Sequence, residues 1–442
     1  MGNDSIAAVR VPGERTASHR WKVLGVGFAA NASFSAAFSG IPTTAVFLRS
    51  GYHLGNNGLG LVLGMLGLGI AVSELPWGLL TDRWGDRRVL LLGLLSTAAA
   101  LAGLALFVVP SGSHVPGVAT LALGLLLVGL LGGSVNGSSG RAVMAWFREG
   151  ERGLAMSIRQ TAVPAGGGLG ALILPALASR FGFASAYTVL GLACAITAVF
   201  AWWWLHEPSH VEGNGVGPAR NAAVAGAGAG AVPVKVSPLR DIGIWRVALG
   251  AGALCVPQIA IVTFGTVFLH DFGRAGVLAI SLTMAAVQTG AAIARVWSGA
   301  WTDRRGNRRA YMRACSVLTA VLFASLALVT GLAGMHHTAM TAVVALMIVL
   351  GGISASAWHG VAFTELATLA GTSRAGTALA IGNTCVFLTL FLTPLAIPLL
   401  LSVGSWPMVW AVASACALIA LPVFPRTARV SKLTAARACD AT

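Results

Sequence analysis

The sequence predicts an all-α polytopic membrane protein with twelve transmembrane helices in two similar sets of six. Of its 442 residues, 56% are hydrophobic and only 10% are charged, whereas soluble domains carry about a quarter charged residues. Many of the apolar runs reach the ~20 residues that a helix needs to cross a bilayer. A short charged motif also occurs twice, once in each half of the chain.

Apolar runs separated by short polar turns place the spans in order along the chain. A stretch in the middle contains Gly213-Asn214-Gly215, Pro218 and a run of alternating Ala and Gly from Ala225 to Ala231, which is typical of a flexible linker. The expected spans lie at roughly 22–48, 57–80, 88–110, 117–146, 153–179, 184–205, 244–270, 276–300, 309–333, 338–363, 375–402 and 405–425. We therefore expect a leader at 1–20, a six-helix bundle at 21–205, a linker at 206–243, a second bundle at 244–425 and a tail at 426–442.

The repeated motif has the pattern Gly-x3-Asp-Arg-x-Gly-x-Arg-Arg, and each copy forms a charged turn between two apolar runs. The match extends beyond it, since Val46-Phe47-Leu48 corresponds to Val267-Phe268-Leu269 at the same spacing, and 153–161 resembles 376–384 further along. This repetition predicts that the second half of the chain is a duplicate of the first. The two copies comprise Gly78, Asp82, Arg83, Gly85, Arg87 and Arg88, and then Gly299, Asp303, Arg304, Gly306, Arg308 and Arg309.

This motif resembles the loop 2–3 signature of the major facilitator superfamily of secondary transporters. The resemblance implies the major facilitator fold, in which two pseudo-symmetric six-helix bundles hold a substrate site at their interface near the middle of the bilayer. It also implies a gating role for Asp82 and Asp303, each near a helix N-terminus of the opposite half, where a negative charge is favoured. The alternative is that both copies are ordinary basic turns on the cytoplasmic side.

The distribution of basic residues predicts the orientation in the membrane. If the first helix starts inside the cell, the cytoplasmic segments hold 23 of the 29 Lys and Arg residues, and the external loops hold Arg49, Arg180 and Arg274. This is the positive-inside pattern, and it places both termini in the cytoplasm. The net charge of +15 is explained by this pattern, so we expect no nucleic-acid partner. We expect a multi-pass protein of the cell membrane, in a bacterial inner membrane.

Four ionisable residues fall inside the expected spans: Glu74, Arg141, Arg159 and Arg295. A charge at the bilayer centre costs at least ~2.5–3.5 kcal/mol, so such residues usually face the interior of the bundle and mark a pathway. One carboxylate against three guanidinium groups leaves a surplus of about two positive charges. An anion bound between the bundles would offset that surplus.

Arg295 is the main candidate for binding the substrate. The pattern Arg295-x3-Gly299-x3-Asp303 resembles that of monocarboxylate transporters, in which the arginine binds the substrate carboxylate, and a guanidinium group matches a carboxylate bidentately. The match is partial, because Ala291 stands where those transporters carry an acid. The structural alternative for Arg295 is an ion pair with Glu74, which occupies the equivalent place before the first copy of the motif.

The other buried charges have weaker assignments. The fold that the resemblance implies brings the spans 153–179 and 276–300 together, so Arg159 would face Arg295 across one cavity. Arg141 is a further substrate-binding candidate, and its structural alternative is to extend toward the membrane surface or join the nearby loop.

Uncharged polar residues complete the candidate site. Gln288 shares a helical stripe with Arg295, and Asn31 and Gln258 are plausible cavity contacts. His359 is a candidate proton carrier near neutral pH, as is Glu74, although a lone histidine beside Trp358 is more often a packed, hydrogen-bonded residue.

These features predict a secondary active transporter that moves a small organic anion, a monocarboxylate in the first instance, by alternating access in symport with protons. The alternative is a drug or metabolite efflux antiporter of the same superfamily, since Pro164, Gly167 and Gly168 partly match the helix 5 signature of such exporters. We find no nucleotide-binding loop, metal cluster or nucleophile motif, so we expect no enzyme activity, metal site or cofactor other than the coupling proton. We expect a monomer in the lipid bilayer.

Overall fold

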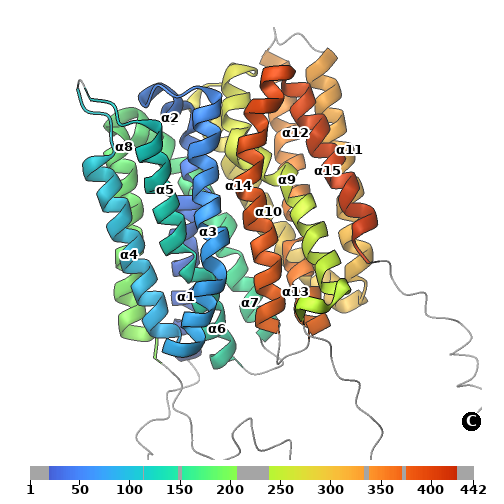
Figure 1. The fold of residues 1–442 in the computed structure, drawn as a ribbon. Helices are drawn as coiled ribbons and strands as arrows, with labels where there is room; N and C mark the ends of the chain where they lie inside the picture. Colours follow the sequence, from blue (N-terminus) through green and yellow to red (C-terminus); the bar gives the residue numbers. More distant parts are fainter. Residues whose placement is uncertain are drawn as a thin grey trace, which may run out of the picture.

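The computed structural model describes residues 19–112, 114–147, 152–206, 238–332, 338–370 and 375–425. These residues are almost entirely helical. The expected tail and nearly all of the expected leader and linker lie outside the described residues. Figure 1 shows two groups of helices side by side, α1 to α8 in blue to green and α9 to α15 in yellow-green to red.

Eleven helical segments of the described residues are long and apolar enough to cross a membrane, and one of them crosses twice. This segment, Ile158–Trp204, has 47 residues, which at 1.5 Å per residue would extend about 70 Å, whereas the hydrocarbon core is only about 30 Å thick. It is broken at Gly182, whose φ of 77° and ψ of 175° are not helical. The described residues therefore make twelve passes, and the predicted fold class is confirmed.

The described residues of the first half form eight α-helices and one 3-10 turn. The second pass is a single long helix, whereas the first, fourth and fifth passes are each made of shorter helices in succession. The elements are α1 (His19–Phe38), η1 (Ile41–Thr44), α2 (Ala45–Gly51), α3 (Asn56–Trp84), α4 (Asp86–Phe107), α5 (Val118–Gly132), α6 (Ser134–Trp146), α7 (Arg152–Gln160) and α8 (Ala162–Trp204).

The second half repeats this arrangement in part. The tenth pass of the chain is divided between α12 and α13, as the fourth is divided between α5 and α6, whereas the seventh and eleventh passes are the single helices α9 and α14. The elements are η2 (Pro238–Arg240), α9 (Ile242–Asp271), α10 (Val277–Arg305), α11 (Arg308–Leu332), α12 (Thr338–Ser356), α13 (His359–Ala370), α14 (Ala375–Val403) and α15 (Trp406–Val423).

Close helix contacts show the duplication directly. A Cβ atom on Gly129 would lie 2.2 Å from the carbonyl oxygen of Leu66, and one on Gly352 would lie 2.6 Å from a methyl group of Val287. Leu66 and Val287 have the same spacing as the two copies of the motif, and Gly129 and Gly352 have the spacing that relates 153–161 to 376–384. The contact between the second and fourth passes is thus repeated between the eighth and tenth.

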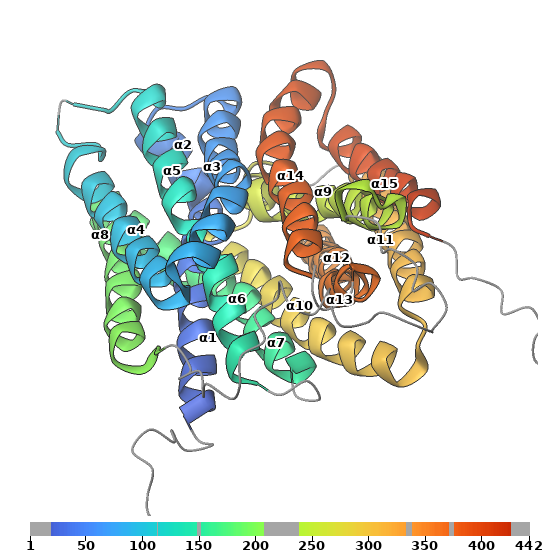
Figure 2. The ribbon, with the colours of Figure 1, turned by 60° about the horizontal axis from the view of Figure 1, so that its bottom comes forward.

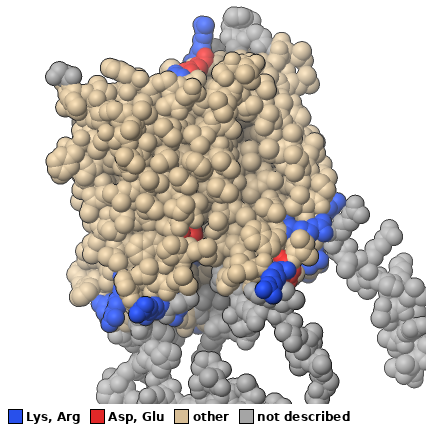
Figure 3. Space-filling model, in the orientation of Figure 1, with Lys and Arg blue, Asp and Glu red and all other residues tan. Residues whose placement is uncertain are grey.

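Apolar side chains cover the outside of the bundle as well as its core. Leu79, Leu106 and Phe107 are 72%, 71% and 78% exposed, which suits contact with lipid. Figure 3 shows Lys, Arg, Asp and Glu gathered at the two ends of the molecule, with the face between them almost free of charge. We call the end that holds residues 81–88 and 302–309 the motif end, and the other, which holds residues 49–56 and 270–277, the opposite end.

The two halves meet along several pairs of helices, among them α3 with α14, α8 with α10 and α2 with α9. Viewed toward the motif end, Figure 2 shows α3 beside α14 on one side of the interface and α10 beside α7 on the other. At one close contact between the halves, Gly60 faces the carbonyl oxygen of Pro394, which a Cβ atom on Gly60 would approach to 2.1 Å. This carbonyl would normally accept a helical hydrogen bond from residue 398, but Pro398 has no N–H to donate. The oxygen therefore points away from the helix, and Gly60, which has no side chain, leaves room for it.

Gly60→Ala should lower the thermal stability of the protein. An exposed Gly→Ala change within a helix usually gains up to ~1 kcal/mol, but here the methyl group would overlap the Pro394 carbonyl, and overpacking costs about 1–3 kcal/mol. The melting temperature of the purified protein in detergent measures this. Gly103→Ala on α4 is the control, because a Cβ atom there meets nothing within 4 Å. Equal melting temperatures for both variants would contradict the tight contact.

Candidate functional site

Hydrogen bonds between the halves lie toward the opposite end of the bundle. Among the described residues, the side-chain hydrogen bond between the halves that lies nearest the motif end is that of Gln288. Gln288 is about three helical turns from the start of α10 at Val277, which lies at the opposite end. Three side chains of the described residues donate across the interface: Arg49 to the carboxylate of Asp271, Thr266 Oγ1 to the carbonyl of Pro42 (3.4 Å) and Gln288 Nε2 to Ser39 Oγ (2.9 Å).

Glu74 is buried in the first half and is held by an amide. It lies on α3 one turn before Gly78 and is only 6% exposed. Its Oε1 accepts a hydrogen bond of 2.7 Å from Nδ2 of Asn136 on α6. No salt bridge to Glu74 is present among the described residues, so the expected alternative of an ion pair with Arg295 is not what the structure contains.

Arg159 lies on α7 and is 4% exposed. Its Nε and Nη2 donate to the hydroxyl oxygen of Ser139 at 3.1 and 2.8 Å, and Nη2 also donates to the backbone carbonyl of Asn136 at 2.6 Å. These partners are all on α6. Most of the guanidinium group is therefore occupied by the protein itself.

Asn31 connects the two charged residues. With its amide oriented so that both polar atoms have partners, Nδ2 donates to Asn136 Oδ1 (3.1 Å), and Oδ1 accepts from Nε (3.2 Å) and Nη2 (2.8 Å) of Arg159. Glu74, Asn136, Asn31 and Arg159 thus form one hydrogen-bonded sequence from four helices, which we call the polar chain. Its one carboxylate and one guanidinium group balance each other through the two amides.

Arg295 is buried in the second half, and no carboxylate among the described residues offsets its positive charge. It lies on α10, is 7% exposed, and its Nε donates to the backbone carbonyl of Ser356 at 3.2 Å. In the part of the chain that the structure describes, this is the only hydrogen bond of its side chain, and no carboxylate forms a salt bridge with it. A guanidinium group has five N–H donors, so most of those on Arg295 are left for a ligand.

His359 is the titratable neighbour of Arg295. It starts α13, its ring stacks on Trp358 with centroids 3.9 Å apart, and it is close enough to Arg295 to interact electrostatically. Its buried Nδ1 makes no hydrogen bond of ordinary geometry among the described residues, although the ring is close enough to the backbone of Ser356 to interact with it. Stacking on Trp358 matches the packed alternative.

The two buried clusters occupy equivalent positions of the duplicated fold. Glu74 corresponds to Arg295 with the spacing of the two motif copies, and Asn136 corresponds to His359 with the spacing that relates Gly129 to Gly352. These are the same relations that connect the repeated helix contacts. The carboxylate of Glu74 in the first half is thus replaced by the guanidinium group of Arg295 in the second. The amide of Asn136 is likewise replaced by the imidazole of His359.

The remaining predicted residues are dispersed. Gln288 lies against Gly167 on α8, where a Cβ atom would come within 2.8 Å of its Nε2. Gln258 lies on α9, and its Oε1 is 3.7 Å from the thiol of Cys255, which in turn is near Arg295. The guanidinium groups of Arg159 and Arg295 form no direct contact, although their helices α7 and α10 pack together across the interface.

Arg141 points to the motif end. Its Nη1 donates to the backbone carbonyl of Thr81 at 2.7 Å, and its Nε lies 3.4 Å from Oδ1 of Asp86. Its side chain is 46% exposed. A cation at the C-terminus of α3 is favourable for the helix dipole. Arg141 thus contacts the motif loop, as its structural alternative predicts, and its role in substrate binding stays a prediction.

The motif loops owe their shape to glycine. Gly85 and Gly306 follow the last residues of α3 and α10 with φ of 84° and 63°, values that residues with a Cβ rarely adopt. Gly78 and Gly299 lie earlier in the motif, and Arg83, Arg88 and Arg304 are exposed. The other basic residues bind groups of the same half: Arg87 to the carbonyl of Trp202 (2.8 Å), Arg308 to Asp303 (2.8 Å) and Arg309 to Glu365 (2.6 Å).

The expected contact of Asp303 with the opposite half is not present among the described residues. Its carboxylate is 60% exposed and pairs with Arg308 in its own loop. The side chain of Asp82, the counterpart of Asp303, lies outside the described residues.

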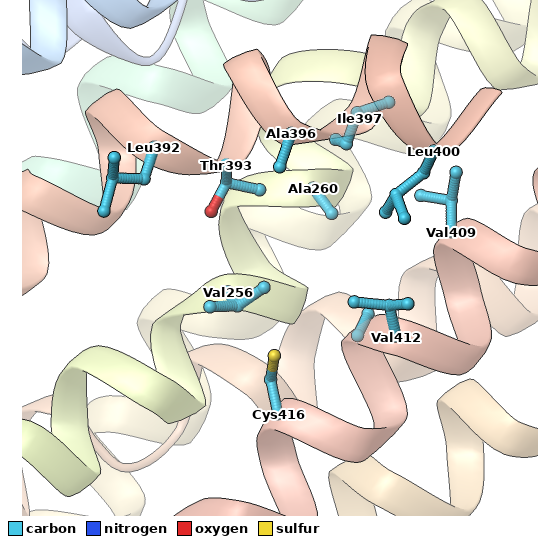
Figure 4. Close-up of a pocket in the computed structure, with 11 residues that line it drawn as sticks. Val256, Ala260, Leu392, Thr393, Ala396, Ile397, Leu400, Val409, Val412 and Cys416 are labelled. Carbon is cyan, nitrogen blue, oxygen red and sulfur yellow. The ribbon is translucent and has the colours of Figure 1, made fainter. Parts of the chain in front are cut away.

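A separate cavity of about 190 Å³ lies in the second half between α9, α14 and α15. Figure 4 shows side chains such as Val256, Thr393, Ile397 and Cys416 around it. Its lining is apolar apart from Thr393 and contains none of the predicted site residues, so it offers no group that would neutralise a charged substrate.

Sequence reasoning missed Asn136, Ser139 and Ser356, although they supply most of the hydrogen bonds to the buried charges. Only the correspondence of Asn136 with His359 in the repeat could have marked one of them in advance.

Comparison with known proteins establishes the class. The family model described as Major Facilitator Superfamily matches residues 26–334 and, in a second match, 247–438. The chain belongs to the major facilitator superfamily. It is a secondary transporter rather than an enzyme, and its membrane-embedded, multi-pass character follows from the same match.

Its relatives include an uncharacterized MFS-type transporter of Mycobacterium tuberculosis, 29% identical over 406 residues, which are 92% of this chain and 85% of the relative. The probable galactarate/D-glucarate transporter of Bacillus subtilis is 27% identical over 206 residues, 46% of this chain and 44% of that protein. Among solved structures, a bacterial homologue of the human lysosomal transporter Spinster, in an inward-facing and unoccupied conformation, aligns with a TM-score of 0.68 at 14% identity, covering 93% of this chain and 95% of that one. This last likeness concerns the fold.

Asn136→Ala should destabilise the protein, because it leaves the buried carboxylate of Glu74 without its hydrogen bond. An unsatisfied buried partner costs about 1–3 kcal/mol, or more for a charged group. Ser138→Ala on the same helix is the control, since the hydroxyl of Ser138 donates to the Ser134 carbonyl within α6, its one hydrogen bond among the described residues. We expect the melting temperature to fall clearly for the first variant and little for the second. The reverse order would show that the polar chain does not stabilise the fold.

Proposed function

We propose that this transporter moves a small organic anion, a monocarboxylate in the first instance, by alternating access and together with protons. The observation that carries the proposal is the buried guanidinium group of Arg295, which has one hydrogen bond and no carboxylate partner within the described residues. A buried charge without a partner is strongly unfavourable. A carboxylate ligand would supply the missing charge and accept two N–H groups bidentately.

The contacts of Arg141 and Arg159 reduce the surplus of buried positive charge from about two to one. Arg141 lies beside Asp86 at the motif end, and Arg159 is connected to Glu74 through the polar chain. Arg295 is then the one buried guanidinium group with no carboxylate nearby in the described part of the chain. One surplus positive charge matches one carboxylate, which favours a monocarboxylate.

Polar groups around the interface are suited to the rest of such a ligand. Gln288 lies at the contact between the halves and already bonds across it to Ser39, and Gln258 lies near Cys255 beside Arg295. Arg159 and Asn31 lie on the other side of the interface, and they would add a second contact if the ligand replaced some of their hydrogen bonds within the polar chain. The relative described as a galactarate/D-glucarate transporter supports a carboxylate as the substrate class. The choice of a monocarboxylate rests on the charge of Arg295 alone, since galactarate and glucarate each carry two carboxylates.

Two titratable groups are placed to couple a proton to the anion. His359 lies beside Arg295, and a proton on its ring would be repelled by the guanidinium group but attracted by a bound carboxylate. Glu74, at the equivalent position of the first half, is buried and bonded to an uncharged amide. Each of the two could carry a proton through one state of the cycle.

The arrangement of contacts between the halves supports alternating access. Side-chain hydrogen bonds join the halves at the opposite end and near the middle, while Asp303 at the motif end bonds within its own loop. We infer a state that is closed at the opposite end. Together with the basic residues at the motif end, this would be an inward-facing state with both termini in the cytoplasm.

An efflux antiporter for an apolar compound is the second candidate, and the apolar cavity between α9, α14 and α15 is the feature that favours it. A thermal-shift screen with carboxylates, inorganic anions and uncharged apolar drugs separates the two, because a bound ligand stabilises the protein by mass action. Stabilisation by apolar drugs alone would favour the antiporter.

Orientation can be tested at the motif end. Trp84 is the last residue of α3 and is 44% exposed, so Trp84→Cys in a background without the natural cysteines gives a thiol that is accessible from that side. We expect an impermeant thiol reagent to label it in inside-out vesicles and not in intact cells. Labelling from outside intact cells would reverse the proposed topology.

Arg295→Lys tests the substrate site. Lysine keeps the positive charge but loses the planar fork, and a hydrogen bond to a charged group is worth ~1.5–3 kcal/mol, so we expect roughly a ten- to hundredfold loss of affinity for the anion found in the screen. Transport in proteoliposomes measures this. The control is Arg313→Lys, since Arg313 bonds to the Leu421 carbonyl outside the proposed site.

A double change, Glu74→Gln with Arg295→Gln, separates the substrate role from a structural ion pair. If the two side chains only neutralised each other, removing both would restore activity. We expect this variant to fold and stay inactive, because Glu74 is held by Asn136 and not by Arg295. An active double variant would overturn the proposed site.

A further inference from the structure

A bidentate ion pair joins the two halves at the opposite end. Arg49 on α2 uses both terminal nitrogens of its guanidinium group to bind both carboxylate oxygens of Asp271, the last residue of α9. His270 Nδ1 lies 2.7 Å from one of those oxygens, and Asn56 Oδ1 accepts a weaker bond of 3.4 Å from Arg49. Of the salt bridges among the described residues, this is the one that links the first half to the second.

The two members of this pair follow the same repeated segment of the chain. Arg49 comes directly after Val46-Phe47-Leu48, whereas the repeated Val267-Phe268-Leu269 is followed by His270 and then Asp271. Arg49 therefore corresponds to His270 in the repeat, and the carboxylate of Asp271 stands one position further along, where the first half has Ser50. Asp271 is also the sole Asp or Glu of the sequence in the segments that connect passes at that end. Arg49 thus has no competing carboxylate partner there.

The surroundings of the pair are uncharged contacts of the same interface. Thr266, on the same helix as Asp271, donates to the Pro42 carbonyl, and Gly60 packs against Pro394. If the halves separate at this end, the ion pair has to break, because its two members belong to different halves. The side chains of Arg49 and Asp271 are 24% and 33% exposed, so water can solvate both charges once they part.

We propose that the Arg49–Asp271 ion pair is a reversible closure that holds the opposite end shut and biases the protein toward the state seen here. Partial exposure limits its strength, since exposed pairs contribute modestly, while bidentate geometry raises it. A closure of this strength shifts the equilibrium between states without locking it. The proposal rests on alternating access but not on the identity of the substrate.

The test uses Thr266→Cys as a probe in a background that lacks Cys194, Cys255, Cys315, Cys385, Cys416 and Cys439. Thr266 is fully buried at the interface between the halves, so its thiol should react only when the opposite end opens. The rate of reaction with a maleimide is measured on purified protein in detergent without substrate. The result is then independent of topology and of the transported compound. Ser39→Cys, also buried at the interface, replaces the probe if that variant does not fold.

We expect Arg49→Ala and Asp271→Asn each to raise the labelling rate about two- to fivefold, as the loss of a partly exposed pair predicts. The charge swap, Arg49→Asp with Asp271→Arg, should return the rate toward that of the starting protein. Unchanged rates in the single variants, or a swap that labels as fast as they do, would overturn the proposal.

The control probe is Thr197→Cys, which is buried within the first half and bonds to the Ala193 carbonyl of its own helix. Its rate should be the same in every background. If it rises together with that of Thr266→Cys, the variants loosen the whole protein, and the ion pair is then a stability element and not a closure.

Discussion

Charged side chains buried between transmembrane helices must be neutralised or hydrogen-bonded, because neither lipid nor a packed helix interface replaces the water that solvated them. The first half of this transporter meets the requirement internally. Glu74 and Arg159 never touch, yet two asparagines connect them into one hydrogen-bonded chain. Arg295 in the second half has a backbone carbonyl and no carboxylate among the described residues. This difference between the halves is what directs the proposed function toward an anion.

Duplication explains why the two clusters lie where they do. Repeated contacts such as Gly129 with Leu66 and Gly352 with Val287 show that the same helices pack in the same way in both halves. Equivalent positions then received different chemistry, with Glu74 and Asn136 on one side and Arg295 and His359 on the other. A shared scaffold thus places two opposite buried charges at matching levels, on either side of the interface.

The interface itself combines backbone packing with a few polar contacts. Gly60 lets α3 approach a carbonyl of α14 that Pro398 leaves without its helical partner. Such contacts depend on shape and are lost as soon as the halves move apart. When Arg49 and Asp271 separate, by contrast, water solvates both charged groups, because both side chains are partly exposed. Together they close one end of the molecule in a way that conformational change can reverse.

The sequence by itself determined the helical membrane fold, the twelve passes, the duplication and the superfamily, because apolar run length and a repeated motif are local properties that need no contacts to be recognised. It also singled out Glu74, Arg159 and Arg295, since charge in an apolar run is conspicuous. Only the tertiary structure decided their partners. In the sequence, Asn136 and Ser139 are ordinary polar residues of a helix, and Arg141 is expected to be as buried as Arg159. In the structure Arg141 is partly exposed and contacts Asp86 and the C-terminal end of α3. Partners depend on how helices rotate and cross, which is set by packing of the whole bundle and not by any single stretch of sequence.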